Sequence, residues 1–201
     1  GVDPLAAIRS GLEGFSGVPG RVALRESPEG VRVLDDTYNA NPHSVARALE
    51  TLAQLRGSGR AIAVLGDMLE LGDETARLHA EVGRAAAAAG VAVLIAVGPL
   101  SRETACGARA SGLSTCLECD DAETAVELVR KHARPGDVVL VKASRGMRLE
   151  RVVTRLLPAT TDPAERVARI MACVNEELCQ NNGTAMFVTL LVGMLDPVSG
   201  A

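Results

Sequence analysis

Aromatic side chains are almost absent from this sequence of 201 residues. They make up 1% of it, tryptophan does not occur, and the three that are present are Phe15, Tyr38 and Phe187. Proteins that bind single-stranded nucleic acids stack the bases on aromatic rings and use a basic surface. With a net charge of −4 and no basic block, the composition argues against nucleic acid as a partner. Tyr38 is conspicuous because it lies in a polar segment.

Long apolar runs and a secretory leader are also lacking. The segment 186–195 is apolar, but it is too short to cross a bilayer. The cysteines are odd in number, and without a leader this is typical of reduced thiols, so the sequence predicts a cytoplasmic protein with no membrane contact. They are Cys106, Cys116, Cys119, Cys173 and Cys179. The pair Cys116 and Cys119 has C-x-x-C spacing, but no second pair or suitably spaced histidine accompanies it, so we predict buried or incidental thiols and no metal site.

Glycine-rich phosphate loops are missing as well. No G-x-x-x-x-G-K-[ST] string occurs, no G-x-G-x-x-G follows a strand, and the only lysines are Lys131 and Lys142. Any phosphate that binds here is therefore not held by this chain alone.

What is present is a regular alternation of apolar and amphipathic segments. The sequence is 47% hydrophobic and 23% charged, enough to bury a core. Apolar strands and helices alternate with a spacing of about 30 residues, which is typical of βαβ units. We expect an α/β fold: a Rossmann-like, mostly parallel sheet with helices on both faces. The expected strands are 22–25 and 31–34, joined as a hairpin, then 61–65, 91–97, 114–117 and 138–141; the expected helices are 44–55, 75–89, 101–111, one capped by Asp120 that ends at His132, and 146–156.

The pattern differs at the two ends of the chain. A helix is expected over 2–12, and residues 1–18 are expected to form the end of a preceding domain and a linker. The main domain is then 19–158. After Pro158 the pattern changes, and we expect 159–201 to be a helix–strand extension of foreign character.

Polar side chains gather where three predicted strands end. The loops are 36–41, 66–72 and 142–146. In a parallel sheet such loops share one edge, where ligands of open α/β folds bind. Arg21, just before the sheet, can reach that edge; a guanidinium suits phosphate or carboxylate, and the Asp36 carboxylate can accept hydrogen bonds from ribose hydroxyls.

Simpler interpretations stay open for these residues. Asp36 could only cap the next helix or stabilise a turn. Gly66-Asp67 could be an ordinary loop, and Lys142 a solvated charge at a strand end. The three histidines lack partners at triad or metal spacing and are interpreted as surface or capping residues; they are His43, His79 and His132.

Several of these strings together resemble a known family. The strings are 19–21 (PGR), 35–44 (DDTYNANPHS), 63–72 (AVLGDMLELG) with His79, and 141–150 (VKASRGMRLE). They are similar to the C-terminal domain of Mur ligases, over about residues 1–158. D-x-Y-N-A-N-P and L-G-D-M-x-E-L-G are typical of the member that adds D-Ala-D-Ala to the UDP-MurNAc-tripeptide. The resemblance implies an ATP- and Mg²⁺-dependent bacterial ligase of peptidoglycan synthesis that acts through an acyl phosphate.

The resemblance also implies roles for individual residues. Arg21 would contact the nucleotide phosphates, and Asp36 would bind the ribose with Asn39 beside it. Lys142, Ser144 and Arg145 would place the dipeptide or the reacting phosphate. A monomer is expected.

The chain departs from the family pattern in several respects. The family's phosphate loop, carbamylated lysine and magnesium ligands belong to a central domain, of which only residues 2–12 would be a remnant, and the domain that grips the UDP-sugar is missing. Ala143 stands where the usual pattern has glycine. The chain begins with Gly1, so a fragment is one interpretation. We expect this chain alone to be inactive as a ligase.

The last 43 residues resemble a different family. Segments 174–178, 186–190 and 195–200 are similar to an internal piece of the metal-dependent serine phosphatases that regulate bacterial sigma factors. Two other functions therefore remain open: a non-catalytic module that binds a nucleotide or a partner, and a fusion in which this extension is regulatory.

Overall fold

A computed structural model describes residues 20–157 of the chain. The chain divides into two units, 1–158 and 159–201, and all described residues belong to the first. The helix expected over 2–12 and the extension 159–201 lie outside the described residues.

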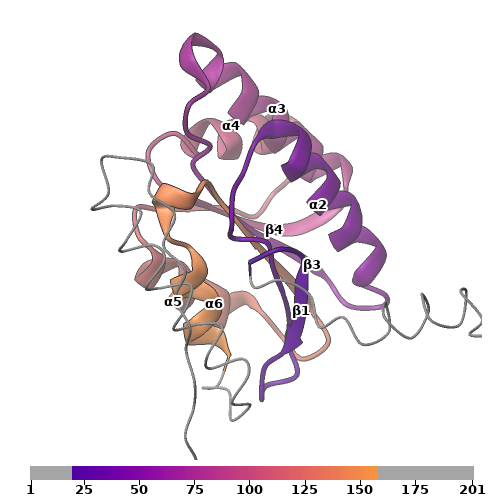
Figure 1. The fold of residues 1–201 in the computed structure, drawn as a ribbon. Helices are drawn as coiled ribbons and strands as arrows, with labels where there is room; N and C mark the ends of the chain where they lie inside the picture. The colour runs from indigo at the N-terminus through magenta and orange to yellow at the C-terminus, as the bar shows by residue number, and fades with distance from the viewer. Residues whose placement is uncertain (1–19, 158–201) are drawn as a thin grey trace, which may run out of the picture. The chain divides into compact units, whose positions relative to one another are not determined.

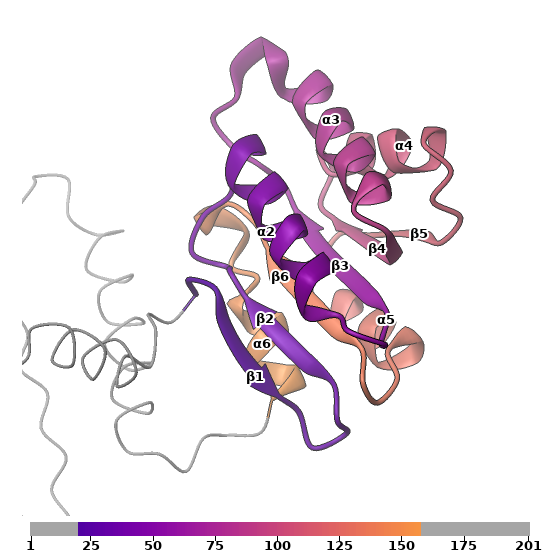
Figure 2. The same ribbon diagram turned by 90° about the vertical axis from the view of Figure 1, so that its right-hand side faces the viewer.

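The described part is built on one six-stranded sheet (Figure 2). The strands lie in the order β1-β2-β6-β3-β4-β5. β1 pairs antiparallel with β2, and the other neighbours pair in parallel. Their bounds are Ala23–Glu26, Arg32–Asp35, Ala61–Gly66, Val91–Val97, Cys116–Cys119 and Val138–Lys142 for β1 to β6. The last strand thus lies between β2 and β3, which puts the ends of these three strands next to one another.

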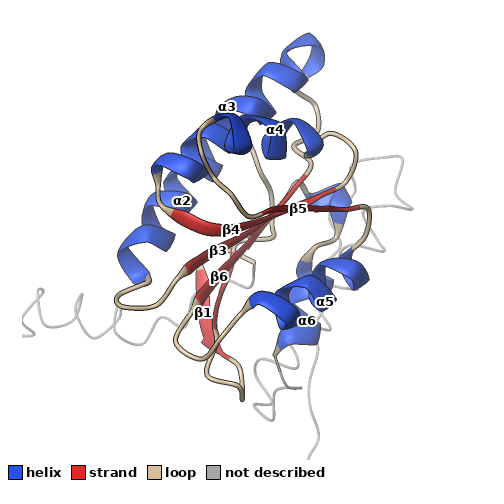
Figure 3. Cartoon of the chain, turned by 180° about the vertical axis from the view of Figure 1, so that it is seen from behind, coloured by secondary structure: helices blue, strands red, loops and turns tan. Residues whose placement is uncertain are grey.

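Helices cover both faces of the sheet (Figures 1 and 3). On one face lie α2 (Pro42–Leu55), α3 (Thr75–Ala88) and α4 (Arg102–Ala110), and on the other α5 (Ala122–His132) and α6 (Glu150–Leu156). Two 3₁₀ turns, η1 (Gly72–Glu74) and η2 (Arg145–Met147), precede α3 and α6. The predicted α/β fold with helices on both faces is confirmed.

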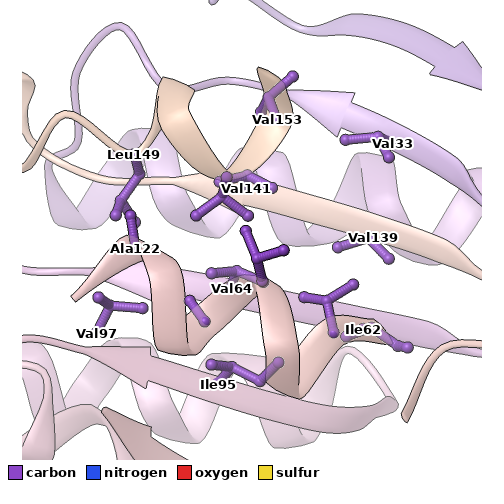
Figure 4. Close-up of a cluster of buried hydrophobic side chains, with 14 of the residues drawn as sticks. Val33, Ile62, Val64, Ile95, Val97, Ala122, Val139, Val141, Leu149 and Val153 are labelled. Carbon is purple, nitrogen blue, oxygen red and sulfur yellow. The ribbon is translucent and has the colours of Figure 1, made fainter. Parts of the chain in front are cut away.

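The alternation of side chains along the strands divides the core into two layers. In β3 every residue is buried. Ile62 and Val64 pack against valines of β6 and against α5 and α6 (Figure 4), whereas Ala63 and Leu65 pack against α2 and α3 on the other face. Burial on both faces explains why this strand is continuously apolar in the sequence.

Four predicted details were wrong. The helix α2 begins at Pro42, two residues earlier than predicted. The fifth strand is Cys116–Cys119, two residues later than predicted. The cap of α5 is Asp121 and not Asp120, because Asp121 Oδ1 accepts a hydrogen bond from the Thr124 N–H at 2.7 Å. The helix predicted over 146–156 is interrupted, because Arg148 takes a left-handed conformation with φ of 52° between η2 and α6.

Two glycines allow α3 and α4 to pack closely. A Cβ built on Gly83 of α3 would lie 2.0 Å from the Thr104 carbonyl oxygen of α4, and one on Gly107 would lie 2.1 Å from the Ala80 carbonyl oxygen. Both obstacles are backbone atoms, which cannot move aside as the end of a side chain can. The distance between these helices therefore depends on the absence of a side chain at each position.

We predict that Gly83→Ala lowers the free energy of unfolding by about 1–3 kcal/mol, because the added methyl group overpacks the helix contact. Alanine favours a helix over glycine by only about 1 kcal/mol. Urea denaturation of the purified chain measures the change. Arg84→Ala, at an exposed neighbour in the same helix, is the control and should shift stability by no more than about 0.5 kcal/mol. A Gly83→Ala protein as stable as the original would contradict the close contact.

Candidate functional site

Three polar loops meet where β2, β6 and β3 end, as the sequence predicted. Ser144, after β6, joins them through its backbone and its hydroxyl. Its N–H donates to the Asp67 carbonyl at 3.0 Å. Its Oγ accepts from the Leu69 N–H at 2.9 Å and lies 3.3 Å from the Ala40 carbonyl, to which it donates. One buried serine thus links the loops that follow all three strands.

A buried ion pair lies beside this serine. The Lys142 Nζ donates to Asp36 Oδ2 at 2.6 Å and to the Asn39 carbonyl oxygen at 2.7 Å. The lysine side chain is only 3% exposed and that of Asp36 13%. A buried ammonium needs such partners. The interpretation of Lys142 as a solvated charge is therefore wrong.

The two consecutive aspartates have different roles. Asp35 is buried, and its Oδ1 accepts from the Thr37 N–H at 3.2 Å and from the Thr37 hydroxyl at 2.7 Å. Asp36 does not cap the following helix, because Asn41 does so through a capping box with Ser44. Turn chemistry therefore accounts for Asp35 and not for Asp36.

A pocket of about 500 Å³ opens beside the ion pair. Four of the predicted site residues line it: Arg21, Asp36, Asn39 and Lys142. The wall continues along one side of α2 with His43, Ser44, Arg47, Ala48 and Thr51. The structure thus brings together a guanidinium, a carboxylate, an ammonium and amides from opposite ends of the described sequence.

The two other predicted residues, Ser144 and Arg145, do not line this pocket. Ser144 is 5% exposed and holds the loops together. Arg145 instead lies near the aromatic ring of Tyr38, with Cζ 5.5 Å from its centroid. Arg21 Cζ lies 4.0 Å from the same centroid.

His79 is fully buried, so its interpretation as a surface or capping residue is wrong. Its Nε2 accepts from the Met68 N–H at 3.0 Å, which leaves the proton of the neutral ring on Nδ1, 2.8 Å from the Thr75 carbonyl. The ring therefore fixes the loop after β3 to the start of α3. Its spacing from Val82 and Ala86, which are also buried, is helical and could have revealed its burial.

Ala143 fits the structure despite its departure from the family pattern. It is fully buried, and a Cβ built on Gly66 of the adjacent strand would lie 2.7 Å from the Ala143 Cβ. The absence of a side chain at residue 66 leaves room for the methyl group at residue 143.

The described residues contain no group of three or more histidine, cysteine, aspartate and glutamate side chains placed to hold a metal ion. Cys106, Cys116 and Cys119 are free thiols, and burial raises the pKa of Cys119 to about 11. Cys173 and Cys179 lie outside the described residues. Within residues 20–157, no helix has the length and apolar character needed to span a membrane.

Comparison with protein families matches residues 20–145 to the family described as Mur ligase, glutamate ligase domain. Similar curated proteins are UDP-N-acetylmuramoyl-tripeptide–D-alanyl-D-alanine ligases. That of Bacillus subtilis is 34% identical over 161 residues, covering 78% of this chain and 34% of the relative. That of Escherichia coli is 38% identical over 159 residues, covering 76% and 32%. The chain spans about a third of the length of the curated relatives that it matches.

Solved structures agree with these sequence matches. A MurF structure from Acinetobacter baumannii aligns with a TM-score of 0.65 and 30% identity, over 76% of this chain and 33% of that one. MurF from Thermotoga maritima in complex with ADP aligns with a TM-score of 0.61 and 29% identity, over 74% and 35%.

We predict that Lys142→Met lowers the free energy of unfolding by about 3 kcal/mol, because it leaves the Asp36 carboxylate without its counter-charge. Lys131, the other lysine, is exposed, so Lys131→Met is the matched control. The double variant Lys142→Met/Asp36→Asn should regain much of the loss. Urea denaturation measures all three; equal stabilities of the two single variants would contradict the burial of this pair.

Proposed function

The chain belongs to the Mur ligase family through its glutamate ligase domain, and from this we propose that it is the C-terminal part of an ATP-dependent ligase. Its substrates would be UDP-MurNAc-tripeptide and D-Ala-D-Ala, as the names of the similar proteins indicate. We propose that residues 19–158 form this C-terminal domain. We also propose that ligation requires the central domain and the domain that binds the UDP-sugar, neither of which residues 19–158 include.

The pocket beside the ion pair is the observation that best supports this proposal. Its carboxylate and guanidinium are complementary to two parts of a nucleotide. We assign the ribose hydroxyls to Asp36, whose side chain remains partly exposed. We propose that Arg21 contacts the phosphates and that Asn39 lies beside the ribose. Both side chains are exposed and line the same pocket.

Lys142 would act mainly by orienting Asp36. Its ammonium already has two short hydrogen bonds, so a ligand that approaches Asp36 meets a carboxylate held in one position. Such prior orientation lowers the entropic cost of binding. Ser144 would keep the three loops in register, and Arg145 would face the dipeptide or the transferred phosphate.

Mg²⁺ would neutralise the charge that develops during transfer of the phosphoryl group. Because the family pattern places the magnesium ligands in a central domain, we assign them mostly to that domain and not to residues 19–158. In the family reaction the peptide carboxylate becomes an acyl phosphate, and the amine of D-Ala-D-Ala then displaces phosphate. We place the enzyme in the cytoplasm, where ATP and the nucleotide-linked precursor occur, and we expect a monomer.

A chimaera tests this function. Residues 20–157 would replace the matching domain of the Escherichia coli relative, with ATP-dependent phosphate release measured in the presence of the tripeptide precursor and D-Ala-D-Ala. The chimaera should turn over, whereas the 201-residue chain alone should not. Asp36→Ala should lower kcat/KM at least about tenfold, because charge-assisted hydrogen bonds to the ribose are lost.

Asp120→Ala serves as the matched control, since this carboxylate is 75% exposed and pairs with Arg102 on the surface. It should leave turnover unchanged. If the folded chimaera binds ATP but does not ligate, the chain is better described as a binding module. Turnover by the isolated chain would contradict the requirement for other domains.

A further inference from the structure

Tyr38 lies close to two guanidinium groups that come from opposite ends of the described sequence. Arg21 Cζ lies 4.0 Å from the centroid of its ring and Arg145 Cζ 5.5 Å. Both distances are within the range in which a cation is attracted by an aromatic ring. Tyr38 is the only tyrosine in the chain, and it is 44% exposed, so burial in the core does not explain its position.

The backbone on either side of Arg21 is held in uncommon conformations. Gly20 has φ of +72°, and its carbonyl accepts a hydrogen bond from the Tyr38 N–H at 2.9 Å. A Cβ on Gly20 would lie 3.3 Å from Thr37 Oγ1 and from the Tyr38 nitrogen. Val22 has φ of 53°, which is strained for a β-branched residue. This close backbone contact places Arg21 beside the ring of Tyr38.

The position of Arg145, the second arginine beside the ring, is fixed by the residue that precedes it. Arg145 begins η2, directly after Ser144, whose hydroxyl is bonded to the loops after β2 and β3. Arg21 and Tyr38 both line the pocket beside Asp36. The ring therefore lies between the anchored start of η2 and the strained segment before β1.

We propose that Tyr38, which lines the pocket, is a positioning residue whose ring holds Arg21 of the pocket wall and the adjacent Arg145 together, so that they bind the polyphosphate of a nucleotide. The ring attracts both cations and so offsets part of their mutual repulsion. It also restricts the rotamers of two long side chains, which otherwise lose conformational entropy when the anion binds. This role rests on the proposed function for the identity of the ligand, and it deepens that function by adding a residue that acts through others.

The intrinsic fluorescence of the chain can be used to test this arrangement. Because it has one tyrosine and no tryptophan, tyrosine fluorescence reports on residue 38 alone. Inorganic tripolyphosphate does not absorb in the ultraviolet and replaces ATP as the anion. Addition of tripolyphosphate to the 201-residue chain should change the tyrosine emission, and Arg21→Ala should change the emission even without the anion.

Isothermal titration calorimetry with tripolyphosphate then tests the role of the ring. Tyr38→Leu should weaken binding about two- to fivefold, as expected for the loss of an exposed cation–π contact. Tyr38→Phe keeps the aromatic face and should bind like the original chain. Arg102→Ala, at an exposed arginine of α4, is the control for a general loss of positive charge. Circular dichroism checks that each variant is folded.

A double-mutant cycle separates positioning from simple structural support. If Tyr38 acts through Arg21, the losses caused by Tyr38→Leu and Arg21→Ala are less than additive in the double variant. Additive losses, a Tyr38→Leu protein that binds as tightly as the original chain, or an original chain that does not bind tripolyphosphate would each overturn the proposal. If the ring-dependent binding is found but the chimaera does not ligate, only the proposed function fails.

Discussion

The ion pair between Lys142 and Asp36 is the constraint on which the site depends. Lys142 ends β6, a central strand, and its ammonium is almost completely buried. A buried ammonium with no partner would cost several kcal/mol, so the loop after β2 must present both a carboxylate and a carbonyl oxygen to it. The positions of Asp36 and Asn39, and with them one wall of the pocket, follow from this requirement.

A second set of hydrogen bonds extends the same constraint to the third loop. The hydroxyl of Ser144 connects Ala40 with Leu69, and His79 holds the neighbouring Met68 from the side of α3. Buried polar groups of this kind are stable only when each has its partner. The loops at this edge therefore form one connected structure, which suits a site that must hold a ligand in a defined orientation.

Tyr38 is an exposed aromatic residue in a structure whose described core contains no phenylalanine, tyrosine or tryptophan. The core of the described residues consists of valine, leucine, isoleucine and alanine, together with Met68. Tyr38 contributes little to it and lies instead beside Arg21 at the pocket. Since the buried core of residues 20–157 contains no phenylalanine, tyrosine or tryptophan, the exposed ring of Tyr38 beside two arginines fits the positioning role that we propose for it.

The sequence by itself determined the order of strands and helices, because apolar periodicity depends on neighbouring residues. It also predicted that polar loops would share one edge, which follows from parallel pairing. It could not decide that Asp36 and not Asp35 meets Lys142, 106 residues away, nor that Arg21 lies beside Tyr38. These contacts arise only because β6 is inserted between β2 and β3 and Gly20 packs against Thr37. They depend on how distant segments are positioned in space, and the types of the residues alone do not specify that.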